Sequence, residues 1–157
     1  MTTIRKAVPT DAPTIAAFNE AMAFETEGKR LDPQRAAAGA RRLFTDPSLG
    51  FYLVAEDAGE TVACLMVTSE WSDWRNAQFW WIQSVYVRPQ WRRKGIFRAL
   101  YQSLHAMAAD DSGVCGFRLY VEKENRAAQA TYHALGMEET HYLLFEELRK
   151  GVNWFKA

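Results

Sequence analysis

The sequence has no excess charge of either sign, because its 19 lysines and arginines are balanced by 19 aspartates and glutamates. A domain that binds nucleic acid or an anionic membrane surface typically carries a broad excess of basic charge. We therefore expect neither a nucleic-acid partner nor a membrane partner. The one basic cluster, Arg92-Arg93-Lys94, is left for a local role.

Long apolar runs, signal-peptide features and metal-ligand spacings are also missing. No run approaches the roughly 20 apolar residues of a membrane-spanning helix, and "MTTIRKAVPTDAP" at the N-terminus has no apolar signal-peptide core. The two cysteines, Cys64 and Cys115, stand in apolar surroundings, which is typical of reduced core residues. We expect a cytoplasmic protein with no metal site.

The sequence does contain enough apolar residues for one core. Its 157 residues are 48% hydrophobic and 24% charged, and no low-complexity segment or linker divides them. These values predict one domain that spans residues 1–157.

Apolar periodicity and turn residues give an alternating pattern of strands and helices. We expect strands over residues 2–8, 51–56, 61–69, 78–87, 116–122 and 141–148, and helices over 12–24, 33–44, 95–109 and 126–135. This order predicts the α/β class, with one mixed sheet and helices on both of its faces.

A basic turn, "WRRKGIFR" at residues 91–98, joins an expected strand to an expected helix. Unpaired backbone amides and the helix dipole favour an anion there, and Gly95 lets the anion approach the backbone closely. The glycines of a dinucleotide fingerprint and the Lys-Ser/Thr pair of a nucleotide P-loop are absent. A pyrophosphate held without a metal ion fits this pattern, and a solvated basic turn explains the same residues.

A second pattern follows the next expected strand. Asn125, Ala128 and Tyr132 are spaced by three and four residues, which places them on one face of a helix. Asn125 is a helix cap, Ala128 leaves room for a ligand, and Tyr132 offers a hydroxyl.

The segments "VYVRPQWRRKGIFRAL" and "LYVEKENRAAQATYHALGM" together resemble the GNAT superfamily of acyl-CoA-dependent N-acetyltransferases. The first is similar to its motif Arg/Gln-x-x-Gly-x-Gly/Ala at Arg92, Gly95 and Phe97. The second is similar to its motif Asn-x-x-Ala-x-x-x-Tyr-x-x-x-Gly, from Asn125 to Gly136. The resemblance implies a central, mostly antiparallel sheet, acetyl-CoA as cofactor, and direct attack by a primary amine of a small molecule or peptide in a ternary complex.

The resemblance also implies which residues hold the cofactor. They are Val85, Tyr86, Val87, Arg92, Arg93, Lys94, Gly95, Ile96, Phe97, Arg98, Asn125, Ala128 and Tyr132. Phe97 departs from the motif, which has a glycine or alanine there. We expect its ring to turn inward onto Leu100 and Tyr101.

The catalytic residues are harder to assign, because Gln83 stands where many family members have a glutamate that relays the amine proton. An amine with a pKa near 10.4 needs about 4.6 kcal/mol to lose its proton at pH 7. Glu25 and Glu27 are the candidate bases. A solvated acidic loop explains the same two residues, and Glu122 or a water chain held by Gln83 and Ser84 is an alternative. By the resemblance, Tyr132 donates to the departing thiolate, although a core tyrosine is a second reading.

The acceptor site is expected to include the stretch "EWSDWRNAQFWW", which carries four of the six tryptophans. Trp71, Asp73 and Trp74 offer aromatic faces and a carboxylate for an amine, beside Glu25, Glu27 and Gln83. A homodimer interface explains the same tryptophans. A non-catalytic acyl-CoA sensor or interaction module is the alternative function, because the usual base is replaced by Gln83.

Overall fold

The computed structural model describes residues 1–151, and these form two compact units. The first unit covers Met1–Leu119, and the second begins at Tyr120. Residues 152–157 lie outside the described part. The single domain expected over residues 1–157 therefore stays a prediction.

The first unit is built on one five-stranded sheet with the order β1-β2-β3-β4-β5. Its strands are β1 (Thr3–Lys6), β2 (Phe51–Asp57), β3 (Glu60–Ser72), β4 (Ala77–Val87) and β5 (Val114–Arg118). The first four strands pair antiparallel, and β5 runs parallel to β4. This confirms the mixed, mostly antiparallel sheet.

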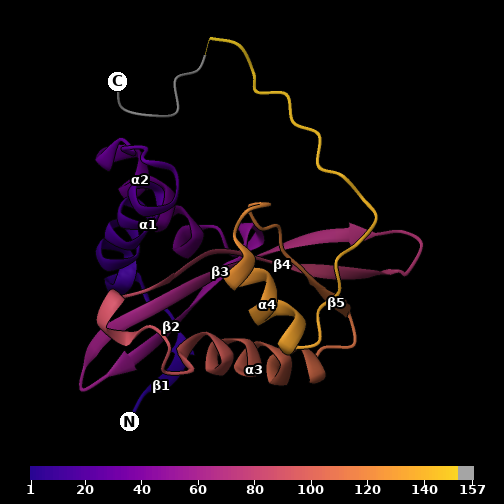
Figure 1. Ribbon diagram of the computed structural model, residues 1–157, viewed down its shortest axis with the longest axis horizontal. Helices are drawn as coiled ribbons and strands as arrows, with labels where there is room; N and C mark the ends of the chain where they lie inside the picture. The colour runs from indigo at the N-terminus through magenta and orange to yellow at the C-terminus, as the bar shows by residue number, and fades with distance from the viewer. Residues whose placement is uncertain (152–157) are drawn as a thin grey trace. The chain divides into compact units, whose positions relative to one another are not determined.

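Helices cover both faces of this sheet, as expected. Helices α1 (Ala12–Glu27) and α2 (Pro33–Thr45) pack side by side on one face, and α3 (Ile96–Ala109) runs along the other (Figure 1). α1 continues to Glu27, beyond the expected end near residue 24, because its stop is Gly28 in the left-handed conformation at φ 63°. Within residues 1–151, none of the helices has the length and apolarity to cross a membrane.

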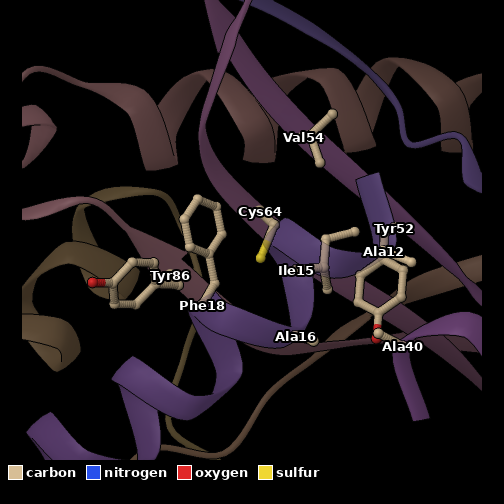
Figure 2. Packing of buried hydrophobic residues seen from close by; sticks show 9 residues of the cluster. All are labelled: Ala12, Ile15, Ala16, Phe18, Ala40, Tyr52, Val54, Cys64 and Tyr86. Atoms are coloured by element: carbon tan, nitrogen blue, oxygen red, sulfur yellow. The ribbon is translucent and has the colours of Figure 1, made fainter. Parts of the chain in front are cut away.

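The core beneath α1 and α2 combines residues from both helices with alternate residues of the central strands. Figure 2 shows this cluster, which comprises Ala12, Ile15, Ala16, Phe18, Ala40, Tyr52, Val54, Cys64 and Tyr86. The i, i+3 spacing of Ile15 and Phe18 places both side chains on the helix face that meets the sheet. Each fully buried residue of the size of Ile15 contributes about 1.5–3 kcal/mol to folding.

The second unit contains α4 (Arg126–Ala134), with the caps that the sequence predicts. The Asn125 side chain accepts a hydrogen bond from the Ala128 amide at 3.1 Å. Gly136, at φ 92°, ends the segment in a left-handed turn. Both features were readable because capping depends on residues that are neighbours in the sequence.

Three expectations are wrong. β5 spans Val114–Arg118 rather than residues 116–122, and no strand forms over 141–148 in the described part of the chain. Side chains in that last segment are strongly exposed, Phe145 at 90%. A strand needs a backbone partner, and the apolar pattern of a segment does not supply one. Cys64 is buried as expected, but Cys115 is exposed.

A buried carboxylate, Asp11, joins the start of α1 to the sheet. Its oxygens accept bonds from the Arg5 guanidinium at 2.8 and 3.0 Å, and one also accepts from the Val8 amide at 2.8 Å. Burial alone would raise the pKa of Asp11, but these donors outweigh it and hold that pKa below its ordinary value. The ionised Asp11 is therefore a stabilising element of the fold.

We expect Asp11→Ala to lower the free energy of unfolding by about 2–4 kcal/mol, because Arg5 and the Val8 amide lose their acceptor. The exposed Asp110→Ala is the control, with a change within about 0.5 kcal/mol. Since the folded pKa of Asp11 is depressed, its contribution is complete above about pH 3.9 and is lost as the pH falls through the folded pKa. Urea unfolding from pH 7 to pH 3 measures the difference in unfolding free energy between wild type and Asp11→Ala. A difference that does not become smaller in acid would contradict the assignment.

Candidate functional site

β4 loses its neighbour on one side halfway along its length. Its parallel pairing with β5 ends at Trp81 and Arg118, whereas its antiparallel pairing with β3 continues to Val87. The next residues of β4 carry a β-bulge, in which Ser84 and Val85 together face Leu65, and Ser84 adopts φ 49°. Within the described residues, 82–87 therefore have no strand on their β5 side, which leaves that edge of the backbone without a pairing strand.

The loop after β4 turns its backbone amides outward. Arg93 at φ 63° and Gly95 at φ 76° are left-handed, and α3 begins at Ile96. The N–H groups of Arg93, Lys94 and Gly95 donate to nothing within the described residues. The first amides of a helix have no partner within the helix, and the dipole of α3 adds partial positive charge at this end.

The space over Gly95 is open. A Cβ built on this glycine would meet no atom within 4 Å. An anion can therefore approach the amides where any other residue would place a side chain. The combination of free amides, a helix start and an open glycine has the features of an anion-binding turn.

Arg92 points back toward the protein and connects three elements. Its Nε donates to the Val87 carbonyl at 2.8 Å, and its Nη2 lies 2.6 Å from an oxygen of Glu25 at the end of α1. The Tyr86 hydroxyl donates to the other Glu25 oxygen at 3.2 Å. We call these three residues, Glu25, Tyr86 and Arg92, the Glu25 cluster.

The Tyr86 ring belongs to the core, but its hydroxyl points away from the other members (Figure 2). Burial raises the pKa of Tyr86, and the neighbouring Glu25 charge raises it further. The phenol therefore stays protonated near neutral pH and serves as a hydrogen-bond donor to Glu25.

Phe97 turns inward as expected. Its ring lies 6.2 Å from that of Tyr101, centroid to centroid, on the same helix. The aromatic side chain at this position therefore packs along α3, and the turn keeps its open approach at Gly95.

The residues expected at the acceptor site do not form one cluster. Glu27 lies 3.5 Å from Lys29. Asp73 accepts from the Trp74 amide at 2.9 Å, so it caps the hairpin turn, and Trp74 is 87% exposed. Gln83 donates from its side-chain nitrogen to the Thr68 hydroxyl at 2.7 Å.

Sequence reasoning missed a second cluster, on the face of the sheet that continues from the α1–α2 core. Glu70 on β3 accepts from the Trp81 indole at 2.9 Å and from Arg118 at 2.9 and 2.8 Å. Arg118 also lies over the Phe79 ring, 3.7 Å from its centroid. Strand alternation places Trp81 and Gln83 on one face, but no local signal pairs Glu70 with a residue 48 positions away.

Glu70 is ionised in this setting. Burial raises its pKa, but the Trp81 and Arg118 donors outweigh burial, so the pKa of Glu70 lies below its ordinary value. The cluster therefore forms a polar and aromatic surface that carries one negative side chain, Glu70, and one positive side chain, Arg118. Among residues 1–151 no group of three His, Cys, Asp or Glu side chains is placed to bind a metal ion.

In the second unit, Asn125, Ala128 and Tyr132 occupy the expected positions around the first turns of α4. The Asn125 oxygen is used by the Ala128 amide. Burial raises the pKa of Tyr132, which keeps its hydroxyl protonated at neutral pH.

Comparison with known proteins gives a consistent result. The model of the acetyltransferase (GNAT) family matches residues 15–137. A possible acetyltransferase from Clostridium difficile 630 is 46% identical, with a TM-score of 0.88 over 95% of this chain and 98% of that one. A search of curated proteins finds no match.

More distant structures share the fold. One is a predicted acetyltransferase with acetyl-CoA from Clostridium acetobutylicum, at 16% identity and a TM-score of 0.76, covering 94% of this chain and 96% of that one. Another is the aminoglycoside N-acetyltransferase AAC(6')-Iy in complex with CoA, at 15% identity and a TM-score of 0.78, covering 95% of each chain.

Proposed function

This chain belongs to the acetyltransferase (GNAT) family, and we propose that it transfers an acetyl group from acetyl-CoA to a primary amine of a small molecule or peptide. The observation that carries this proposal is the turn after β4. Its free amides at Arg93, Lys94 and Gly95, with the start of α3 behind them, suit the diphosphate of CoA.

The open edge of β4 takes the next part of the cofactor. Val85–Val87 begin in the bulge, and no strand of residues 1–151 pairs with their β5 side. The Val87 carbonyl accepts from Arg92, and the other backbone groups on this side are the proposed partners of the amides of the pantetheine arm. The bound arm then lies along β4, and the diphosphate reaches the turn at Gly95. From their match to the family motif, Asn125 and Ala128 are also proposed cofactor-binding residues.

The reaction itself needs no covalent enzyme intermediate. The neutral amine attacks the thioester carbonyl carbon, and the tetrahedral intermediate collapses with cleavage of the C–S bond and departure of the CoA thiolate. The nitrogen loses its extra proton, and the thiolate takes up one proton, so that the products are the neutral amide and CoA. Tyr132 is the proposed donor to that thiolate. Its raised pKa makes full proton transfer to a thiolate of pKa near 8.5 uphill, so its main contribution is a hydrogen bond to the developing charge.

The amine reaches the site as an ammonium ion and must lose a proton before it attacks. Gln83 cannot take that proton, but its side-chain oxygen accepts hydrogen bonds while its nitrogen donates to Thr68. Glu25, with Glu27 as the second candidate, is the proposed base, either directly or through a water molecule. Glu25 is favoured because Tyr86 and Arg92 fix its position beside β4.

The proposed acceptor surface continues along the same sheet face from Gln83 to Trp81 and Glu70. Trp81 and Phe79 provide aromatic surface, and the Glu70–Arg118 pair provides acceptors and donors. The turn at Trp71, Asp73 and Trp74 is the proposed outer rim.

A second candidate function is a non-catalytic acyl-CoA sensor, and one observation favours it. Gln83 takes the place of the usual base, and Glu25 is engaged by two donors. Incubation with acetyl-CoA and a panel of amines separates the two functions. Release of CoA that depends on an amine supports the transferase, whereas tight binding without turnover on any amine supports the sensor.

We expect Gly95→Val to weaken CoA binding at least tenfold, because the new side chain fills the approach to the amides. The matched control is Gly59→Val. Gly59 has a similar φ of 79° and equally open surroundings, but it lies in the β2–β3 turn. Calorimetry on the folded variants measures the affinities. Wild-type affinity in Gly95→Val would contradict the phosphate site.

Tyr132→Phe should lower kcat by about 10- to 1,000-fold and leave the affinity for CoA nearly unchanged, because it removes a contact made in the transition state. The control is Tyr142→Phe, at a tyrosine that is 66% exposed. Steady-state kinetics with chemistry shown to limit the rate is the measurement. An unchanged kcat would mean that Tyr132 is a packing residue and does not assist the departure of the thiolate.

Trp74→Ala should raise the KM of the acceptor amine about tenfold without altering CoA binding, because an aromatic face for the ammonium is lost. Light scattering on the same variant tests the dimer explanation. A lower molecular mass with unchanged acceptor kinetics would identify Trp74 as an interface residue.

A further inference from the structure

In the Glu25 cluster, the Arg92 guanidinium has two candidate anionic partners, the Glu25 carboxylate and the diphosphate of CoA. Arg92 binds the Glu25 carboxylate at 2.6 Å. The residue that follows it, Arg93, begins the run of free amides at the proposed phosphate site. A diphosphate on those amides would therefore bind one residue along the backbone from a cation that is already paired with Glu25.

The pair between Arg92 and Glu25 is weak enough to be exchanged. The two side chains are 42% and 38% exposed, and ion pairs with this exposure contribute little to stability. A diphosphate carries more negative charge than one carboxylate, and its phosphate oxygens can accept two parallel N–H bonds from one planar guanidinium. On charge and geometry, the diphosphate is the stronger partner.

Glu25 does not lose its position when Arg92 leaves. The Tyr86 hydroxyl still donates to it, and the Tyr86 ring is anchored in the core against Phe18 at 4.9 Å. The carboxylate therefore stays at the end of α1, beside β4, with one neutral donor and no paired cation.

We propose that Arg92 exchanges its Glu25 partner for the CoA diphosphate, so that cofactor binding releases Glu25 for the acceptor ammonium. The inference rests on the proposed function, since it requires CoA at the turn. It makes Arg92 a positioning residue that links the two substrates, and it favours binding of acetyl-CoA before the amine. By linkage, the acceptor and the cofactor then each raise the affinity for the other.

The exchange predicts that Glu25→Gln binds CoA about 1.5- to 5-fold more tightly than wild type, because the diphosphate no longer competes with a carboxylate for Arg92. Glu20→Gln removes the same charge from the same helix and is the matched control, with a change below about 1.5-fold. Acetylpantetheine lacks the diphosphate, so its affinity should be the same in wild type and Glu25→Gln. Calorimetry measures all of these affinities.

A double-mutant cycle completes the test. In an Arg92→Met background, Glu25→Gln should no longer tighten CoA binding, because the guanidinium for which the anions compete is gone. The exchange is overturned if Glu25→Gln leaves CoA affinity unchanged or weakens it. It is also overturned if acetylpantetheine shows the same gain, or if the gain persists with Arg92→Met.

These outcomes separate the inference from the function on which it rests. Wild-type protein that binds no CoA would overturn the proposed function and the exchange together. Wild-type protein that binds and uses acetyl-CoA, with Glu25→Gln indistinguishable from Glu20→Gln, would overturn the exchange alone.

Discussion

The incomplete pairing of β4 is the constraint on which the rest of the site depends. On one edge β4 is held by β3 along its whole length, and on the other edge β5 stops at Arg118, opposite Trp81. Beyond that point no strand of residues 1–151 pairs with this edge, and the Val87 carbonyl accepts from the Arg92 side chain instead. The bulge at Ser84 and the left-handed residues of the following turn lie in this same stretch. The open edge and the outward amides are thus consecutive parts of one chain segment.

Ion pairs, rather than isolated charges, define the electrostatics around this segment. Glu25 is paired with Arg92, Glu70 with Arg118, and Glu60 with Arg88. Each of these pairs joins one basic and one acidic side chain, so the charges balance locally as they do in the whole sequence. Attraction of a substrate by a broad field of one sign has little support in this arrangement. Recognition instead depends on which partner each arginine holds, and this is why exchange of a partner is the natural way for one substrate to affect another.

The two candidate bases on the acceptor side have different surroundings, and the sequence does not show this difference. Glu25 and Glu27 look equivalent in "AFETEG", but the structure gives them different surroundings. Glu25 is bound by a phenol and a guanidinium, whereas Glu27 lies near Lys29 in the loop after the helix. The side-chain nitrogen of Gln83 donates to the Thr68 hydroxyl, and the side-chain oxygen of Gln83 can accept a further hydrogen bond. The proposed base, Glu25 on α1, and the side-chain oxygen of Gln83 on β4 therefore come from different elements.

The sequence by itself determined the elements and the features whose chemistry is local. Gly95 before a helix, Asn125 as a cap and Gly136 as a stop depend on contacts within about four residues, so their patterns are readable along the chain. The strand predicted over 141–148 failed because a strand needs a partner that no local pattern supplies. Only the tertiary structure decided the pairs Glu25–Arg92 and Glu70–Arg118, which join residues 67 and 48 positions apart. Such pairs depend on how the sheet register and helix packing bring distant side chains together, and the periodicity of a single sequence carries no record of that geometry.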